Sequence, residues 1–301
     1  MIVVYGSINI DVVGHAPTLM RPGETVMGTT LEFAPGGKGA NQALAACRAG
    51  GEVRMVGCVG QDDFANRALA LLSEAEIDLS FVRVMDRHTG TALIVVDDAG
   101  ENMITVLPGA NSRLTCTALE QAGLQSGDWL LLQLETPLDG VLAAARYARR
   151  QGARTVLNLA PFMAFPAPLL DEIDILVVNE TELEGVLDML GAPALDRGSS
   201  VRWLAERLDV TVVATLGAEG ALAVSESEAI HVPAIKITPL DTVGAGDTFV
   251  GYLAAGLAGG LDIRSSLNRA SAAAGLACLK SGAQNSIPEH FEVDDWLARL
   301  A

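Results

Sequence analysis

The segment DTVGAGDTF, residues 241–249, places small residues between two aspartates. Gly244, Ala245 and Gly246 can direct successive backbone N–H groups at one point where a helix begins, which would form an anion hole. Asp247 would then lie in the first turn of that helix. It could complement the helix dipole, or it could act as a general base that removes a hydroxyl proton while the N–H groups hold developing phosphate charge. The spacing alone favours the helix dipole slightly.

A second segment, GGKGAN at residues 36–41, also precedes a helical pattern. Its glycines would let a ligand approach the backbone, the helix start would offer free N–H groups, and Lys38 would add positive charge. The glycine spacing does not fit the dinucleotide fingerprint G-x-G-x-x-G, so we do not expect NAD binding. The P-loop, zinc-protease and nucleophile-elbow motifs do not occur either. The four histidines are scattered and lack the spacing of metal ligands (His15, His88, His231 and His290).

Composition restricts the class of protein. The chain has 301 residues, of which 50% are hydrophobic, so it can bury a sizeable core. Its formal net charge of −17 argues against a nucleic-acid partner, which would require clustered Lys and Arg. The four cysteines lie far apart, which predicts free thiols in a reducing compartment. The N-terminal apolar run is too short for a signal peptide or a membrane span, so we expect a cytoplasmic protein that binds no membrane.

Apolar runs alternate with helical patterns along most of the chain. We expect strands at residues 2–8, 53–60, 129–134, 155–160, 174–179 and 211–217, and helices at 36–50, 62–76 and 138–151. This alternation predicts an α/β fold with a mainly parallel sheet covered on both faces. The last third carries small or apolar residues at helical spacing, which predicts packing helices at 244–260, 265–282 and 291–300.

Two regions interrupt this alternation. Residues 12–34 and 89–107 alternate apolar and polar positions, and the second contains a DDAGEN turn that indicates a hairpin. Together they could form a small β-layer that projects from the main sheet, and this layer could be an antiparallel sheet edge or a lid over a site. Because no long linker occurs, we expect a single domain over residues 1–301 with this excursion.

The two glycine-rich segments resemble, in order and separation, the paired signatures of the ribokinase-like (PfkB) carbohydrate kinases. The matching pieces between and before them are GSINID at 6–11, QLETPL at 133–138, LNLAP at 157–161, NETE at 179–182 and TLGAEG at 215–220. The resemblance therefore covers essentially the whole chain. It implies a ribokinase-like α/β fold, with a central mostly parallel sheet, helices on both faces and a small β-sheet lid that often forms a dimer interface.

The same resemblance implies a kinase that uses ATP to phosphorylate a sugar's primary hydroxyl, with the 5-hydroxyl of D-ribose as the expected acceptor. Another acceptor of the same family, such as fructose, a nucleoside or a sugar acid, is the first alternative. A non-catalytic sugar-binding module is the second, although a pure binder would need no base at Asp247. The implied partners are a small-molecule sugar and ATP, with Mg²⁺, a K⁺ activator and a second copy of the chain at the lid.

Residue roles follow from the matching motifs. Asp247 would be the base, and Gly244, Ala245 and Gly246 the anion hole. The sugar hydroxyls would contact Asn9, Asp11, Gly37, Lys38, Asn41 and Glu135, together with Asp247. The nucleotide side would comprise Asn158, Asn179, Glu182, Thr215, Gly217, Gly220 and Ser271. Asn179 and Glu182 are the pair associated with Mg²⁺ and phosphate, but the same residues could simply cap a helix.

Two further assignments come from the resemblance alone. The loops that bind a monovalent cation match Asp241, Val243, Gly282 and Ser286. Ser271 stands where the family often has a histidine beside the adenine, and this departure puts the packing of the adenine in question.

Overall fold

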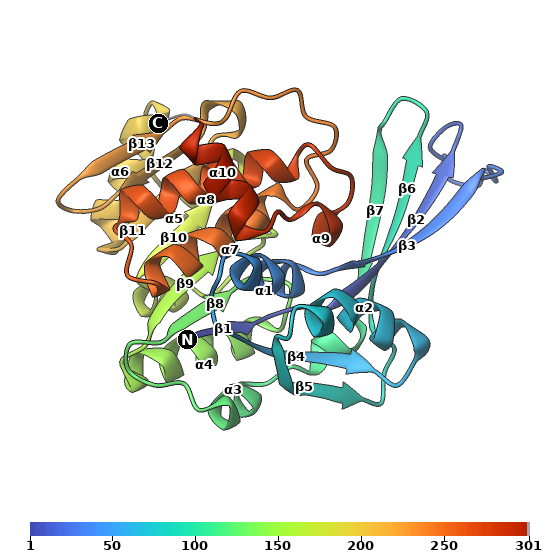
Figure 1. Cartoon of the computed structure of the whole chain (residues 1–301), viewed down its shortest axis with the longest axis horizontal. Helices are drawn as coiled ribbons and strands as arrows, with labels where there is room; N and C mark the ends of the chain where they lie inside the picture. Colours follow the sequence, from blue (N-terminus) through green and yellow to red (C-terminus); the bar gives the residue numbers. More distant parts are fainter. Residues whose placement is uncertain (300–301) are drawn as a thin grey trace.

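The computed structural model describes residues 1–299, and its main body is built on a nine-stranded sheet (Figure 1). The strands follow the order β13 (Ala229–Val232), β12 (Ala221–Val224), β11 (Thr211–Thr215), β10 (Ile175–Val178), β9 (Arg154–Asn158), β8 (Trp129–Leu132), β1 (Ile2–Tyr5), β4 (Val53–Gly60) and β5 (Asp78–Met85). The β11–β12 and β12–β13 pairs are antiparallel, and all other neighbours run parallel. The predicted α/β class with a mainly parallel sheet is confirmed.

Alternate side chains of the strands enter two hydrophobic cores, one on each face of the sheet. Ile2 and Val4 of β1 belong to one core, and Val3 and Tyr5 belong to the other. The first core is covered by α1 (Lys38–Arg48), α2 (Asp63–Glu74), α7 (Ala245–Ala258), α8 (Ile263–Ala277) and α10 (His290–Ala298). The second is covered by α3 (Cys116–Ala122), α4 (Leu138–Gln151), α5 (Glu180–Leu190) and α6 (Arg197–Leu208), with the short helices η1 (Gly109–Arg113) and η2 (Ala167–Glu172). Both faces are therefore buried, as parallel sheets require.

A second, four-stranded sheet projects from this body (Figure 1). Its order is β3 (Thr30–Gly36), β2 (Asn9–Ala16), β6 (Gly90–Asp97) and β7 (Asn102–Leu107); β2 and β6 run parallel, and the outer pairs are antiparallel. The two interrupting regions of the sequence supply these strands, so the predicted small β-layer that projects from the main sheet is confirmed. The observed strands differ from the predicted region 12–34, because β2 begins at Asn9 and residues 17–29 form no strand. We call this four-stranded sheet the lid sheet.

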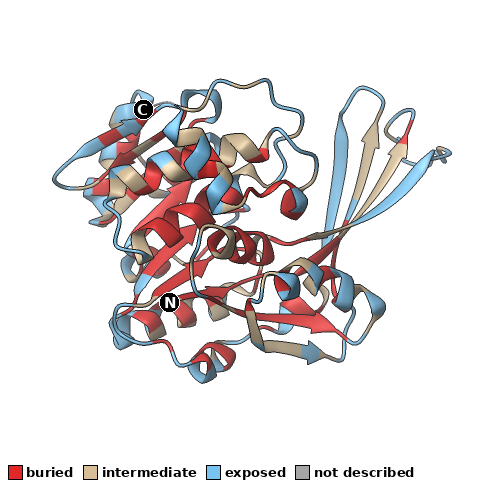
Figure 2. Cartoon of the chain, viewed as in Figure 1, coloured by how far each residue is buried: buried red, intermediate tan, exposed pale blue. Residues whose placement is uncertain are grey.

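The lid sheet is much less buried than the body (Figure 2). Every residue of β7 is exposed, and β3 is exposed over its first four residues. Several exposed side chains of the lid sheet are large and apolar, namely Leu31, Phe33, Leu93, Met103, Ile104, Val106 and Leu107. Over residues 1–299, no helix combines the length and the apolar character that a membrane crossing needs.

Candidate active site

Candidate residues from distant parts of the sequence lie at the carboxyl edge of the parallel sheet. Asn158 ends β9, Asn179 follows β10, Thr215 ends β11, and Glu135 lies three residues beyond β8. β1 stands between β8 and β4. The strands β4 and β5 lie on one side of β1, and the strands from β8 to β13 lie on the other. In α/β sheets, such a switch in strand order opens a crevice at the carboxyl ends, where ligands bind.

Asp247, from the second glycine-rich segment, contacts side chains of the helix that begins in the first one. It is buried in the first turn of α7, as predicted. Its Oδ2 accepts a hydrogen bond from Asn41 Nδ2 at 2.9 Å, and its Oδ1 accepts one from Gln42 Nε2 at 2.9 Å. Both donors come from α1, which packs against α7. Sequence analysis missed Gln42, although it directly follows the GGKGAN segment.

The loop before Asp247 turns sharply into α7. Gly244 has a left-handed backbone (φ 76°), and a Cβ there would meet Ala283 Cα at 2.9 Å, so only glycine fits. The Ala245 N–H donates to Thr242 O at 3.2 Å, so this member of the predicted anion hole already has a partner. Gly246 borders open space, because a Cβ built on it would meet no atom within 4 Å. Gly246 is also exposed, and a phosphate oxygen could approach it at the positive end of the helix.

The start of α1 differs from the prediction. The Lys38 N–H donates to Glu135 Oε2 at 3.1 Å, and the Gly39 N–H donates to Ser7 Oγ at 3.3 Å. The Ala40 N–H donates to Ser7 O at 2.9 Å, and Ser7 Oγ itself donates to Glu135 Oε2 at 2.6 Å. The expectation of free N–H groups at this helix start is wrong, because Ser7 and Glu135 satisfy them. Sequence analysis also missed Ser7. The feature that could have identified it is its position in the GSINID segment, between β1 and Asn9.

Asn9 and Asp11 lie two residues apart on β2 and therefore share one face of the lid sheet. Asn9 is buried, and its Oδ1 accepts a hydrogen bond from Asn111 Nδ2 at 2.7 Å. Gly37, with φ 89°, passes so close that a Cβ would meet Asn9 N at 2.7 Å. The lid sheet thus brings these two polar side chains to the start of α1.

Charges are concentrated on this side of the site. Burial, followed by the neighbouring carboxylates of Glu135 and Asp247, raises the pKa of Asp11 to about 7. Burial by itself lowers the pKa of Lys38, but the carboxylates around it outweigh burial and the net shift is upward. Lys38 therefore stays charged among acids, and it offsets part of their mutual repulsion.

Asn179 and Glu182 form a capping box at the start of α5. Asn179 Oδ1 accepts the Glu182 N–H at 2.8 Å, and Glu182 Oε2 accepts the Asn179 N–H at 2.9 Å. The helix-cap interpretation is thus confirmed for both residues. Burial raises the pKa of Glu182, while the Asn179 amide and Lys38 oppose the shift. Within residues 1–299, no donor reaches Glu182 Oε1, so one oxygen of this acid is available to a hydrated cation.

The remaining nucleotide-side residues lie farther along the sheet edge. Gly217 (φ 53°) and Gly220 (φ 98°) form the turn between β11 and β12, next to Thr215, and the short helix η3 (Gly217–Glu219) spans this turn. Asn158 Oδ1 accepts a hydrogen bond from Gln42 Nε2 at 3.1 Å. Ser271 is buried in α8, and its Oγ donates to Pro233 O at 3.1 Å. In this structure its hydroxyl therefore joins α8 to the segment that follows β13.

Asp241 joins the two loops predicted to hold a monovalent cation. Its Oδ1 accepts the Val243 N–H at 2.9 Å, and its Oδ2 accepts the Gly282 N–H at 2.8 Å. Gly282 precedes the short helix α9 (Ala283–Ser286), in which Ser286 Oγ donates to Ala283 O at 2.9 Å. The part of the chain that the structure describes contains no group of three or more His, Cys, Asp or Glu side chains suited to a metal. A cation between these loops would therefore rely on one carboxylate and on backbone and hydroxyl oxygens, a donor set compatible with a monovalent ion.

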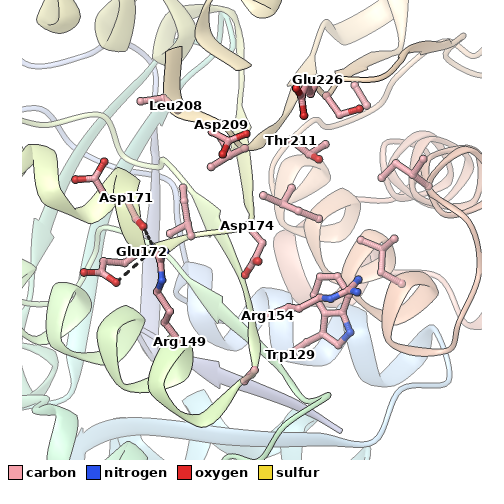
Figure 3. Close-up of a pocket in the computed structure, with 18 of the residues that line it drawn as sticks. Trp129, Arg149, Arg154, Asp171, Glu172, Asp174, Leu208, Asp209, Thr211 and Glu226 are labelled. Atoms are coloured by element: carbon pink, nitrogen blue, oxygen red, sulfur yellow. Dashed lines mark hydrogen bonds and ion pairs between the residues drawn. The ribbon is translucent and has the colours of Figure 1, made fainter. Parts of the chain in front are cut away.

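A hollow of about 1120 Å³ lies at the opposite, amino-terminal edge of the sheet (Figure 3). Trp129, Arg154 and Thr211 line it, and each lies at the start of a strand. Arg154 stacks on the Trp129 ring at 5.4 Å, and Arg149 donates to the backbone carbonyl of Asp171 and forms an ion pair with Glu172. None of the candidate residues lines this hollow. We therefore place the candidate site at the carboxyl edge, where the polar groups converge.

Comparison with known proteins agrees with this geometry. Residues 1–290 match the model of the pfkB family carbohydrate kinases. A ribokinase from Haemophilus influenzae is 37% identical over 300 residues, which cover 98% of this chain and 97% of that protein. The chain belongs to the pfkB family of carbohydrate kinases. Its ribokinase-like fold accounts for the position of the lid sheet beside the carboxyl edge.

Solved structures of family members share the whole architecture. The structure of ribokinase from Thermotoga maritima has a TM-score of 0.91 and 33% sequence identity, and the match covers 99% of both chains. The structure of Arabidopsis thaliana ribokinase complexed with ribose and ATP has a TM-score of 0.88 and 30% identity, and it covers 98% of both chains.

The raised pKa of Asp11 makes stability depend on pH. The unfolded carboxyl ionises near pH 3.8, whereas the folded one ionises near pH 7. The contribution of the Asp11 carboxyl to the stability of the fold is therefore fully present below about pH 4 and is lost as the pH rises through about 7. Asp11→Asn removes this ionisation. From pH 5 to pH 8, we expect the free energy of unfolding of Asp11→Asn to gain on the order of 2 kcal/mol relative to wild type.

Urea unfolding at both pH values measures this difference. Asp98→Asn, in the exposed turn between β6 and β7, is the matched control, and its difference from wild type should not change with pH. A constant difference between Asp11→Asn and wild type would show that burial and the neighbouring carboxylates do not raise the pKa of Asp11.

Proposed function

We propose that this protein transfers the γ-phosphate of ATP to the primary 5-hydroxyl of D-ribose, which yields ribose 5-phosphate and ADP. The observation that carries the proposal is the buried Asp247 carboxylate, held by two side-chain amides next to the exposed Gly246 at the start of α7. Family membership supports a carbohydrate acceptor. The similar Haemophilus and Thermotoga proteins are ribokinases, and the Arabidopsis structure contains ribose and ATP.

In the proposed reaction, Asp247 accepts the proton of the 5-hydroxyl as that oxygen attacks the γ-phosphorus. The bond between the γ-phosphorus and the β,γ-bridging oxygen breaks, and ADP leaves with its electron pair. Positioning and charge stabilisation supply most of the catalysis in such transfers. The Gly246 amide and the positive end of α7 would offset the charge that develops on the transferred group.

Sugar hydroxyls would be held by the polar groups around the start of α1. Asn41 donates to Asp247 through Nδ2, and its buried Oδ1 accepts no hydrogen bond from residues 1–299. An unpaired buried carbonyl oxygen is costly, so a sugar hydroxyl donating to it would remove a penalty. Asn9, Asp11 and Glu135 add acceptors nearby, which favours an acceptor with several free hydroxyls.

Two ions complete the proposal. Glu182, with Asn179, would hold hydrated Mg²⁺ at the phosphates of ATP, where the ion offsets phosphate charge. The loops joined by Asp241 would hold K⁺ through oxygens of Val243, Gly282 and Ser286, as an activator that steadies the turn into α7.

We also propose that residues 1–301 act as a single kinase domain and that two copies associate through their lid sheets. Support comes from the exposed apolar side chains of the lid sheet, such as Ile104 and Met103 on β7. Contiguous exposed apolar surface is typical of interaction sites.

The substrate assignment predicts a specific order of acceptors in a coupled assay of ADP release. We expect the highest kcat/KM with D-ribose, above D-fructose, 2-deoxy-D-ribose, nucleosides and sugar acids, and a lower rate when K⁺ is omitted. 5-Deoxy-D-ribose should give no ADP above background, because it lacks the attacking oxygen. A higher kcat/KM for fructose or a nucleoside would overturn the choice of ribose but not the kinase assignment. Sugar binding by calorimetry without any ADP release would instead identify a binding module.

The lid-sheet dimer predicts a change in sedimentation. Wild type should sediment as a dimer, and Ile104→Asp should sediment as a monomer because it places a charge in the apolar contact. Met189→Asp, on the exposed side of α5, is the control and should remain dimeric. A monomeric wild type, or a dimeric Ile104→Asp variant, would contradict association through β7.

A further inference from the structure

Gln42 is fully buried in α1 and connects three elements of the site. Its Nε2 donates to Asp247 Oδ1 at 2.9 Å and to Asn158 Oδ1 at 3.1 Å. Its Oε1 accepts a hydrogen bond from Gln133 Nε2 at 2.7 Å. One side-chain amide thus joins the proposed base on α7, the end of β9 and the residue that follows β8.

The carboxylate fixes the direction of both glutamine amides. An ionised Asp247 can only accept hydrogen bonds, so Gln42 must turn its nitrogen toward it. The Gln42 oxygen then faces Gln133, which must present its own nitrogen. Reversing either amide would bring two acceptors or two donors together in a buried place, which is costly. Gln133 therefore acts on Asp247 only through Gln42.

Gln133 uses only part of the hydrogen-bonding capacity of its amide. It is fully buried, and its Oε1 accepts no hydrogen bond from the described chain. An unpaired buried carbonyl oxygen destabilises a fold. The benefit of this amide is therefore its single donated hydrogen bond, which orients Gln42.

We propose that Gln42 is a positioning residue for phosphoryl transfer and that Gln133 supports it. Asn41 holds one oxygen of Asp247 and Gln42 holds the other, so together they prevent rotation of the carboxylate about its Cβ–Cγ bond. Without Gln42, the base is no longer aimed at the hydroxyl proton, while the polar groups proposed for the sugar remain in place. This inference rests on the proposed function, because a positioning role requires a reaction at Asp247.

The test is a double-mutant cycle with Gln42→Leu, Gln133→Leu and the double variant, assayed with the acceptor that wild type phosphorylates best. We expect Gln42→Leu to lower kcat by about 10- to 100-fold, since misplacing a catalytic group by about 1 Å has effects of this size. The KM for the sugar should stay within about threefold of wild type, because sugar contacts are kept. Gln133→Leu should lower kcat less, and the double variant should match Gln42→Leu.

Thr155→Val is the matched control. Thr155 lies on β9 near Asn158, it is buried, and its Oγ1 has no partner among residues 1–299, so kcat should stay at the wild-type value. Thermal unfolding shows which variants fold. If Gln42→Leu does not fold, the kcat and KM of Gln133→Leu test the proposal instead.

Unchanged kcat, a loss confined to KM, or losses that multiply in the double variant would overturn the inference alone. A wild type without turnover on any acceptor would instead overturn the proposed function, and the inference with it.

Discussion

The structure depends on the burial of one carboxylate, that of Asp247. A buried charge is tolerated only when it is well hydrogen-bonded, and here Asn41 and Gln42 supply one donor to each oxygen. These hydrogen bonds join α1 to α7 although 206 residues separate Asn41 from Asp247. The turn into α7 has its own constraint, since a bulkier residue at Gly244 would collide with Ala283.

The same constraint organises the surroundings of the site. Glu135 satisfies the first amide of α1 and accepts from Ser7, so a residue proposed for sugar binding also fixes the helix that carries Asn41 and Gln42. Asp241 instead joins the loop before α7 to the start of α9, because it accepts the Val243 and Gly282 N–H groups. Lys38 offsets part of the repulsion among the surrounding carboxylates.

Sequence alone predicted the central parallel strands, because buried strands are continuous apolar runs, and it placed Asp247 in a first helical turn. It missed β5, β12 and β13, which lie toward the edges of the main sheet; β5 has only half-buried and exposed positions, and β13 alternates exposed and buried ones. Gln42, Gln133 and Ser7 were missed because their importance comes from long-range hydrogen bonds, which residue type and spacing do not encode. The lid sheet was predicted, but its strand order was not, since alternation indicates a half-buried strand without identifying its neighbours.

The central claim is that Asp247 removes the proton from the acceptor hydroxyl. The most direct measurement is kcat for ADP formation by Asp247→Asn, with sugar binding followed by calorimetry and Asp188→Asn, an exposed acid on α5, as the control. The account predicts a kcat at least about a hundredfold below wild type while sugar binding persists. Turnover close to that of wild type in Asp247→Asn would contradict it.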